Sequence, residues 1–587
     1  MYVAFENDHQ LLIGCDNVDL LSAMQETMDG KKVYRKNQII VPLRAGPKLF
    51  RFKNTGDINF GTNVKEKILD ISNEIKRRKA NIKVIKESYN TNNIPFNYEL
   101  KGIYPPLEHQ KTIYHAIMQN RISAIIAEAG TCKTGPYLWA IDERIRRGEI
   151  KRCLVITLSH LKKNVLAEMK IQTPNLKGVV LENRSRCDKI LNKKFKSDKK
   201  NLDYDVYIAN YESMFTLVEL FDDNFFQFVI ADEAHRIGSP KSRQTETIID
   251  KFENTKYKSI ITGSLNSNNT LSFYMPFRFL GPDTVPEAKY WSFRQIYQRA
   301  VDTDKRIWVD LAGTKDLVKN IIGNISVYFS KRDCLDLPDK IYKKMTCELD
   351  TTQKKYYDQV KNDLLLILDD MCKKCSAKDI CTRKTCDNEI AIKSALVMVG
   401  KLNQICCGFY RNTRYKINDN GTKVDDSNII TFDKNPKLDL LMNVINDIDI
   451  NQKIIIWTGY THAIELIKDR INKAYGNESY VTAYKDFDAF KQVERFKDSD
   501  KRFLIANPSK AGTGLNIQFS NYQIFFSNNY SFIQRDQAES RQDRKGQKNN
   551  VTIIDLLCEN SIDVEILKIL MNKEDLAHRL NSLAKVI

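Results

Sequence analysis

Residues 123–134 read Ser-Ala-Ile-Ile-Ala-Glu-Ala-Gly-Thr-Cys-Lys-Thr, and this stretch indicates the fold of the chain. Its apolar start is typical of a buried strand, and the small residues that follow predict a loop leading into a helix. In such a loop, backbone N–H groups and the positive end of the helix face phosphate groups. Lys133 can then reach phosphate oxygens, and the Thr134 hydroxyl can ligate Mg²⁺. We therefore expect a phosphate-binding loop here.

A second apolar segment ends in two adjacent carboxylates. Residues 228–235 read Phe-Val-Ile-Ala-Asp-Glu-Ala-His, which predicts a buried strand followed by Asp232 and Glu233. A carboxylate at the end of such a strand can hold the metal ion of a phosphoryl-transfer site, and its neighbour can orient the attacking water. We expect Asp232 to hold Mg²⁺ and Glu233 to position water.

A third segment, residues 537–547, contains Arg541 and Arg544. If the segment is helical, the spacing of three residues places both arginines on one face. Two guanidinium groups presented together suit the charge on a transferring phosphoryl group. Each of the three segments alone is compatible with a turn, a solvated strand end or a solvated charged helix. Their order in one chain favours a nucleotide motor with two lobes.

Further short segments surround these three. They are Leu107-Glu108-His109-Gln110, Thr157-Leu158-Ser159-His160, Ile208-Ala209-Asn210-Tyr211-Glu212, Ile261-Thr262-Gly263-Ser264, Arg278-Phe279-Leu280-Gly281-Pro282-Asp283, Asp336-Leu337-Pro338-Asp339-Lys340, Leu402-Asn403-Gln404-Ile405-Cys406 and Ala511-Gly512-Thr513-Gly514-Leu515-Asn516. From about Tyr104 to the C-terminus the chain resembles the Swi/Snf-type ATPases of helicase superfamily 2, a group of double-stranded DNA translocases.

The resemblance implies an α/β fold with two tandem RecA-like lobes, which are parallel sheets flanked by helices, and helical insertions. It also implies a DNA-dependent ATPase that uses ATP and Mg²⁺. The implied catalytic residues are Lys133, Asp232, Glu233, Arg541 and Arg544, with Thr134 and Asp232 at the magnesium ion. The implied ATP-binding residues are Gln110, Gly130, Thr131, Cys132, Lys133, Thr134 and Gly514. The residues implied to contact DNA or couple hydrolysis to movement are Asn210, Tyr211, Thr262, Ser264, Gly512 and Thr513.

The chain departs from the family pattern at three places. Cys132 stands where the family has glycine, and Ala127 stands where it has an acidic residue. Because a side chain at position 132 strains a loop that favours glycine geometry, we expect weakened nucleotide affinity or an altered loop path. Ser264-Leu265 replaces the family's Thr-Pro, which raises a question about coupling efficiency but not about the fold.

We expect five parts along the chain. Residues 1–60 predict a small α+β module with a helix at Val18 to Met28, and 61–98 predict a basic helix and linker. Residues 99–270 are the expected first lobe, 271–435 helical elaborations, and 436–587 the second lobe. The first module weakly resembles the HARP domain that precedes the motor in annealing helicases.

Within residues 64–90, basic side chains alternate with a helical apolar stripe. Lys76, Arg77, Arg78 and Lys79 form a continuous basic run. Such a face is either solvated or contacts nucleic-acid phosphates.

A cysteine-rich hairpin is expected at residues 372–386. Cys372, Cys375, Cys381 and Cys386 could surround Zn²⁺, although their spacing is not that of a standard finger. The alternatives are thiols without a metal, or a zinc site completed by Cys406 or Cys407. The apolar surroundings of Cys406 and Cys407 predict that both are buried.

Composition agrees with a nucleic-acid partner. The 587-residue chain carries a formal net charge of +18, which favours a polyanion, although A/T-rich coding bias would also enrich lysine. No segment predicts a signal peptide or a membrane span, so we expect a soluble, intracellular protein, in the cytoplasm of a bacterial or virus-infected cell or in the nucleus. We also expect a monomer. The leading hypothesis is a motor on double-stranded or branched DNA that remodels or anneals it in replication, recombination or repair. The alternatives are a viral transcription-associated or RNA-directed ATPase, and a DNA-binding scaffold with weak ATP turnover.

Overall fold

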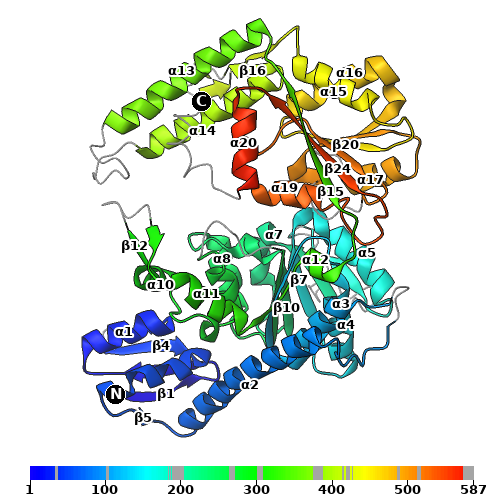
Figure 1. Cartoon of the computed structure of the whole chain (residues 1–587). Helices are drawn as coiled ribbons and strands as arrows, with labels where there is room; N and C mark the ends of the chain where they lie inside the picture. The colour runs from blue at the N-terminus through cyan, green and yellow to red at the C-terminus, as the bar shows by residue number, and fades with distance from the viewer. Residues whose placement is uncertain are drawn as a thin grey trace. The chain divides into compact units, whose positions relative to one another are not determined.

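The structure is a computed structural model that describes residues 1–33, 37–100, 105–182, 184, 187, 204–263, 271–300, 308–373, 388–412, 415–417, 423–425, 428–484, 489–511 and 517–572. It forms two compact units. The N-terminal unit comprises Met1–Ala300 and Trp308–Cys334, and the C-terminal unit contains the chain from Leu335 onward. Figure 1 labels their helices and strands.

The chain begins with a five-stranded sheet in the order β3-β4-β2-β1-β5. Helix α1 (Val18–Met28) packs on it, as the sequence predicts, and its first turn is capped by the Asn17 side chain, which accepts from the N–H of Leu20 at 2.9 Å. The strands, with the 3₁₀ segment that follows β4, are β1 (Tyr2–Asn7), β2 (Gln10–Gly14), β3 (Lys31–Lys32), β4 (Gln38–Pro42), η1 (Leu43–Thr55) and β5 (Asn59–Phe60). We call residues 1–60 the N-terminal module.

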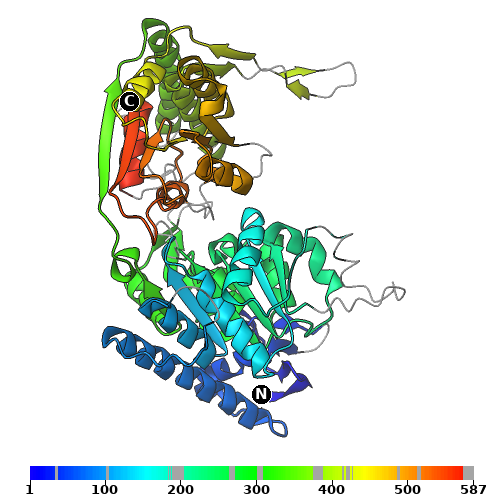
Figure 2. The same cartoon turned by 90° about the vertical axis from the view of Figure 1, so that its right-hand side faces the viewer.

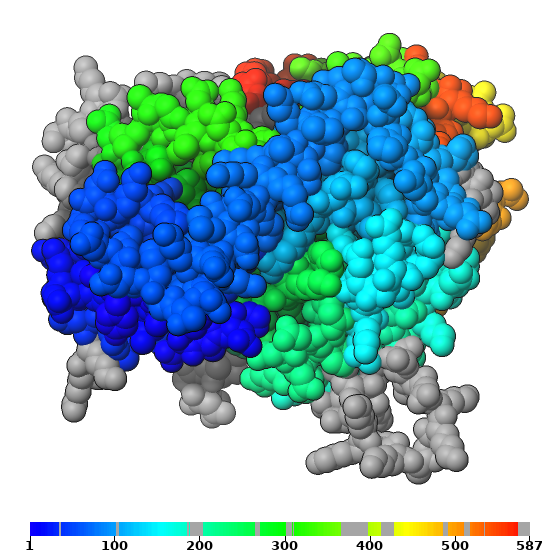
Figure 3. All heavy atoms as spheres, turned by 90° about the horizontal axis from the view of Figure 1, so that it is seen from below, coloured from blue at the N-terminus to red at the C-terminus, as the bar shows by residue number. Residues whose placement is uncertain are grey.

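Helix α2 (Val64–Asn90) connects this module to the first lobe. Its apolar stripe is divided between two cores, since Ile68 packs with the module and Ile82 packs with the lobe. From below, the module and α2 form a continuous surface of the N-terminal unit (Figure 3). The module is therefore packed into the same compact unit as the lobe.

The first lobe is built on a seven-stranded parallel sheet in the order β14-β6-β11-β10-β7-β9-β8. Its strands are β6 (Ile122–Ala127), β7 (Cys153–Thr157), β8 (Gly178–Val180), β9 (Val206–Asn210), β10 (Phe228–Asp232), β11 (Tyr257–Thr262) and β14 (Ser326–Phe329). Its helices include α3 (Glu108–Gln119), α4 (Thr134–Arg146), α5 (Lys162–Gln172), α7 (Tyr211–Leu217), α8 (Arg243–Lys251), α9 (Tyr274–Leu280), α10 (Tyr290–Tyr297), α11 (Thr314–Gly323) and α12 (Lys331–Cys334). A hairpin of β12 (Gln298–Ala300) and β13 (Trp308–Asp310) follows α10.

The sheet is buried on both faces. Along β6, Ala124 lies in one hydrophobic core and Ile125 in the other, because successive side chains of a strand point to opposite faces. Continuous apolar strands and helices on both faces are the arrangement expected of a parallel sheet.

The C-terminal unit contains a six-stranded parallel sheet in the order β15-β24-β23-β20-β22-β21. Its strands are β15 (Lys340–Cys347), β20 (Ile454–Trp457), β21 (Tyr480–Ala483), β22 (Phe503–Ala506), β23 (Tyr522–Phe525) and β24 (Val551–Cys558). Its helices are α13 (Thr351–Lys373), α14 (Asn388–Cys406), α15 (Pro436–Asn446), α16 (Thr461–Tyr475), α17 (Ala489–Lys497), α18 (Pro508–Ala511), α19 (Phe532–Glu539) and α20 (Ile562–Met571). Figure 2 shows β15 as the long strand at the edge of this sheet. The predicted pair of parallel sheets flanked by helices is confirmed.

Two strands revise the predicted helical elaboration at 271–435. Strand β14 extends the sheet of the first lobe beside β6, and β15 pairs along its full length with β24 in the second lobe. The interval also contains the antiparallel pair β16 (Phe409–Asn412) and β19 (Asn428–Thr431), and β17 (Tyr415–Ile417) with β18 (Lys423–Asp425). Only four residues form β14, and β15 is mostly exposed or half-buried, so neither presents the long apolar run of a central strand.

Among the described residues, no helix is both long and apolar enough to cross a membrane.

Arg78 departs from the predicted basic face of α2. Its side chain is buried and its guanidinium donates to the Asp283 carboxylate at 3.1 Å, whereas the neighbouring Lys76 is exposed. Arg44 of the N-terminal module binds the same carboxylate at 3.0 Å. Because α2 turns Arg78 toward the lobe and not toward solvent, Arg78 does not belong to the exposed basic face of α2.

Replacing Arg78 with alanine is expected to lower the free energy of unfolding of the N-terminal unit by about 3 kcal/mol, since it removes one partner of a buried ion pair. Lys76→Ala on the same helix should change it by less than about 0.5 kcal/mol. Urea unfolding of the full chain followed by fluorescence measures both. Equal stability of the two variants would contradict the structural role of Arg78.

Candidate active site

The phosphate-binding loop connects β6 to α4, as expected. Two side chains of α3 hold its backbone carbonyl groups: Gln110 Nε2 donates to the carbonyl of Cys132 at 2.9 Å, and His109 Nε2 lies 2.8 Å from the carbonyl of Thr131. Gln110 Oε1 accepts from the N–H of Leu107 at 3.0 Å. Gln110 thus supports the loop in this structure, and its contact with ATP stays a prediction.

The loop lysine meets the predicted water-positioning carboxylate. Lys133 Nζ lies 3.0 Å from Glu233 Oε1, and both side chains are largely buried. The two residues come from different strands, because β6 and β10 are parallel and lie on either side of β11, so their carboxyl ends open onto one edge of the sheet. The fold therefore brings together the segments predicted to bind phosphate and metal.

Asp232 occupies the end of β10 beneath this pair. Its Oδ2 accepts from the Thr157 hydroxyl at 3.1 Å, and its Oδ1 accepts from the N–H of Glu233 at 3.1 Å. Burial, with the nearby charge of Glu233, raises the pKa of Asp232 to about 6. A buried carboxylate whose pKa is raised in this way is stabilised by a cation, which is the property required of a metal ligand.

Glu233 is perturbed in the opposite direction. Burial acts to raise its pKa, but the Lys133 ammonium and His235 together outweigh burial and hold the pKa of Glu233 well below its usual range. His235 Nδ1, at 3.4 Å from Glu233 Oε2, adds to this effect. Glu233 is therefore a carboxylate at neutral pH and can accept a hydrogen bond from water.

These residues fit a magnesium–nucleotide complex. The donors for phosphate are the Lys133 ammonium, the Thr134 hydroxyl and the N-terminal turn of α4, which has no side-chain cap. Asp232 and Thr134 supply the oxygen ligands that Mg²⁺ prefers. Bound Mg²⁺ would neutralise charge on the phosphate oxygens.

Backbone strain is concentrated at this site. Seven described residues other than glycine have positive φ, and five of them are Asn or Asp, which tolerate the left-handed region. The remaining two are Cys132, with φ of 55°, and Glu233, with φ of 54°. The predicted strain at Cys132 is thus present, and Cys132 adopts the backbone conformation that glycine favours.

Two of the predicted coupling or DNA-contact residues, Thr262 and Tyr211, lie beside the site. Thr262 ends β11 and is fully buried, and a Cβ added to Gly263 would lie 3.4 Å from the N atom of Ala129 in the phosphate loop. Tyr211 is also fully buried, and its hydroxyl donates to the carbonyl of Asp232 at 2.7 Å. This position suits a coupling role for Tyr211 and not a surface contact with DNA.

Asn210 lies at the end of β9. Its Oδ1 accepts from Lys162 Nζ at 2.9 Å, and its Nδ2 donates to Glu212 at 2.9 Å. The predicted contact of Asn210 with DNA stays a prediction.

In the C-terminal unit, the predicted helix through Arg541 and Arg544 is wrong. Helix α19 ends at Glu539, and both arginines lie in the turns that follow. Gln542 donates to the carbonyl of Tyr522 at 2.9 Å and draws the chain onto the sheet, which ends the helix. Arg541 Nε and Arg544 Nε each donate to a backbone carbonyl four residues earlier. Their catalytic role stays a prediction.

Several predicted residues lie outside the described part of the chain. They are Ser264, Gly512, Thr513, Gly514, Cys375, Cys381 and Cys386. Cys372 belongs to α13, but its side chain is not described. The zinc hypothesis for residues 372–386 therefore stays untested.

A different group of metal-ligand types occurs at the end of β24. Ligand atoms of Cys406, Cys558 and Asp563 all lie within 4.8 Å of one another. However, Asp563 already accepts from Lys437 Nζ at 2.5 Å and from Asn403 Nδ2 at 2.9 Å, and burial raises the pKa of Cys406. A protonated thiol is a poor metal ligand, so these contacts indicate a structural cluster. The predicted burial of Cys406 and Cys407 is confirmed.

Two site residues were not singled out for these roles from the sequence. Thr157 orients Asp232 through its hydroxyl. Glu128 joins the loop to the end of β14, because its Oε2 accepts from the N–H of Lys331 at 2.9 Å. The position of Thr157 at the end of an apolar strand could have indicated that it lies beside Asp232. No local sequence pattern indicates the contact between Glu128 and Lys331.

Cys132→Gly is expected to raise stability by up to about 1 kcal/mol and to retain or improve ATP affinity, because it relieves the left-handed backbone. Cys132→Ala removes the thiol but keeps the strain, so its stability should match the wild type. Thermal unfolding and equilibrium nucleotide binding measure both effects, and ATP should slow alkylation of the wild-type thiol. A glycine variant that binds ATP much more weakly would show that the cysteine is an adapted part of the loop.

Comparison with known proteins identifies the family of this chain. The model of the SNF2-related domain matches residues 23–410, which is more than half of the chain. Over 499 residues, the chain is 24% identical to the SWI/SNF chromatin-remodeling complex subunit snf22 of Schizosaccharomyces pombe, covering 82% of this chain and 27% of that protein. It is 24% identical to the DNA repair and recombination protein RAD54-like of Drosophila yakuba over 488 residues, covering 77% and 59%. The chain thus spans less than two thirds of the length of these relatives.

Among solved structures, the Sulfolobus solfataricus SWI2/SNF2 ATPase core in complex with dsDNA is 20% identical, covers 84% of this chain and 97% of that one, and has a TM-score of 0.36. The family match over residues 23–410 includes the phosphate loop, Asp232, Glu233 and Thr262. The chain belongs to the SNF2-related domain family, the Swi/Snf-type ATPases of helicase superfamily 2.

Proposed function

We propose that the protein is an ATP-driven translocase on double-stranded or branched DNA. The observation that supports this most directly is the meeting of Lys133 and Glu233 at 3.0 Å beside the buried Asp232. An ammonium group that can bind phosphates, a carboxylate that can orient water and a carboxylate that can bind a metal ion lie at one edge of a parallel sheet. These are the groups that phosphoryl transfer to water uses.

Each residue has a defined task in this proposal. ATP replaces Glu233 as the partner of Lys133, which frees the Glu233 carboxylate to orient the attacking water. Thr157 keeps Asp232 in position through its hydroxyl, and Tyr211 ties the backbone of the same strand end to α7. Arg541 and Arg544 are proposed to stabilise the charge on the transferring phosphoryl group.

A DNA partner is supported by charge and by relatives. The net charge of +18 favours a polyanion, and relatives include proteins named for chromatin remodelling and for DNA repair and recombination. Contacts to phosphates position a protein on DNA without reading its sequence, so we propose little sequence preference. We further propose a role in remodelling or annealing branched DNA in replication, recombination or repair, with the HARP-like N-terminal module and the exposed face of α2 as contacts.

The alternative functions predict that the ATPase rate depends on nucleic acid in different ways. An RNA-directed or viral transcription-associated ATPase would be stimulated by RNA. A scaffold with weak turnover would bind ATP and DNA without coupling them. Comparing ATPase rates with duplex DNA, forked DNA, single strands and RNA distinguishes all three.

Lys133→Ala should impair ATP binding or turnover, whereas Glu233→Gln should bind ATP and hydrolyse it at least about 100-fold more slowly, because it removes the charge that orients water. Arg541→Ala and Arg544→Ala should also slow turnover while circular dichroism stays unchanged. Lys319→Ala, at an exposed position of α11, is the control. Undiminished DNA-stimulated turnover in Glu233→Gln would refute the assignment.

Replacing the exposed Lys76 and Arg77 with glutamine should weaken DNA binding and flatten its dependence on salt by roughly 0.9 logarithmic units per lost phosphate contact. It should also reduce any preference for forks over linear duplex. Lys319→Gln, an exposed position on α11, is the matched control. If the double variant keeps the wild-type salt slope and fork preference, α2 is not part of the DNA contact.

A further inference from the structure

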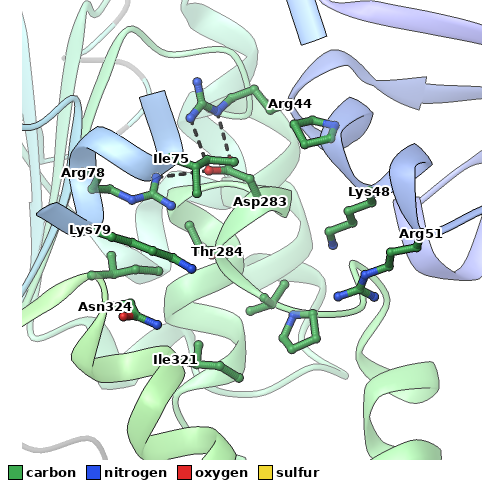
Figure 4. A pocket seen from close by; sticks show the side chains of 14 residues that line it. Arg44, Lys48, Arg51, Ile75, Arg78, Lys79, Asp283, Thr284, Ile321 and Asn324 are labelled. Atoms are coloured by element: carbon green, nitrogen blue, oxygen red, sulfur yellow. Dashed lines mark hydrogen bonds and ion pairs between the residues drawn. The ribbon is translucent and has the colours of Figure 1, made fainter. Parts of the chain in front are cut away.

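A cavity of about 250 Å³ lies within the N-terminal unit, where η1, α2 and η5 (Pro282–Thr284) meet (Figure 4). It shares no residue with the candidate active site. The charged side chains that line it are Arg44, Lys48, Arg51, Arg78, Lys79 and Asp283. Three parts of the chain that are distant in sequence thus contribute to one strongly basic cavity.

Carboxylates neutralise only part of this charge. Asp283 binds both Arg44 and Arg78, and it is the lone acidic side chain among the lining residues. Two further carboxylates reach lining residues, with Glu74 on Arg44 and Glu287 on Arg51. Five basic side chains therefore face three carboxylates, so two of them have no acidic partner and carry the excess positive charge when protonated.

The excess is carried by Lys48 and Lys79. Within the described part of the chain, neither has a carboxylate at ion-pair distance, and Lys48 Nζ donates to the carbonyl of Thr27 at 3.2 Å. Lys48 is only 9% exposed, and its burial together with the charges of Arg278 and Arg51 lowers its pKa to about 7. The lowered pKa shows that the protonated form of Lys48 is costly without an anion, so an anion in the cavity would favour that form and stabilise the N-terminal unit.

The side chains are directed at a common space. In Figure 4 the ammonium groups of Lys79 and Lys48 point into the cavity from α2 and η1, and the Arg51 guanidinium lies beside them. Arg78 is 3% exposed, and its Nε has no hydrogen-bond partner within the described structure.

We propose that this pocket binds a phosphoryl group, either of a small phosphorylated compound or of a nucleic-acid end. A phosphate group carries nearly two negative charges, which matches the excess, whereas a single carboxylate carries one. Lysine and arginine together are the common phosphate-binding side chains. The cavity is smaller than the pockets of drug-sized ligands, about 300–1,000 Å³, which favours a compact anion.

A purely structural cluster does not account for the same arrangement. The Arg44 and Arg78 ion pairs overcome the burial of Asp283 and hold its pKa well below the usual range, so this carboxylate is already satisfied. Adding Lys48 and Lys79 around a satisfied carboxylate contributes repulsion between like charges. A ligand that supplies negative charge removes that repulsion.

The test uses the full chain carrying Lys133→Ala, so that the anion cannot bind at the phosphate loop in the usual way. Binding of pyrophosphate is measured by isothermal titration calorimetry at about 150 mM salt, because salt at this concentration screens weak binding at the exposed surface. We expect one pyrophosphate per chain. Lys79→Ala with Arg51→Ala should weaken its affinity by about tenfold or more, and Lys83→Ala should leave it within about twofold. Lys79 is exposed and the Arg51 side chain is 49% exposed, so circular dichroism should show an intact fold; Lys48→Met provides a second pocket variant.

Two sources of the phosphoryl group are distinguished by adding duplexes with 5′-phosphate or 5′-hydroxyl ends. A preference for the phosphorylated end that the pocket variants lose assigns the site to nucleic-acid ends. Equal binding of both duplexes, with pyrophosphate binding retained, assigns it to a free anion. The proposal is overturned if the Lys133→Ala chain binds no pyrophosphate, if the pocket variants bind it unchanged, or if malonate binds as tightly.

Discussion

The ion pair between Lys133 and Glu233 is the interaction on which the functional interpretation depends. It exists because β6 and β10 run parallel on either side of β11, so that segments about a hundred residues apart open onto one edge. In low dielectric this contact keeps Glu233 ionised, while Asp232 nearby has the opposite tendency. Two adjacent carboxylates therefore acquire different chemical properties from their partners alone.

The strain at Cys132 and Glu233 belongs to the same arrangement. Both residues follow strands and must turn the chain sharply at the edge where the phosphates are expected, and both adopt left-handed backbone geometry. Hydrogen bonds join His109 and Gln110 to the loop carbonyls and hold the Cys132 backbone in this conformation, so the strained loop persists. A glycine at position 132 would adopt this backbone conformation without strain. With cysteine there, the hydrogen bonds from α3 help to stabilise the loop.

The N-terminal module is connected to the lobe by charge as well as by apolar packing. Arg44 binds Asp283, and Asp29 binds Arg278 at 2.7 Å, so each side contributes both an acid and a base. Buried pairs of this kind contribute more to a specific geometry than to net stability. They align η1, α2 and η5, and the basic cavity between these elements is a consequence of that alignment.

The sequence by itself determined the fold class, and it placed the loop before Thr134 and the paired acids Asp232 and Glu233 at the ends of buried strands, because apolar strands, small-residue loops and adjacent acids are local signals. It also determined α1 and α2 nearly to the residue, since a regular apolar stripe marks each helix. It did not determine that α19 ends before Arg541, because that end depends on Gln542 binding the distant Tyr522.

Only the tertiary structure decided which side chains of a helix or strand are available to a ligand. Arg78 and Lys79 are neighbours in one basic run, yet one is buried against Asp283 and the other is exposed. Likewise, β14 and β15 are sheet strands because each pairs with the edge of a sheet, β14 with β6 and β15 with β24. In each case the deciding partner lies far away in the sequence, and its position is set by packing and not by any local pattern.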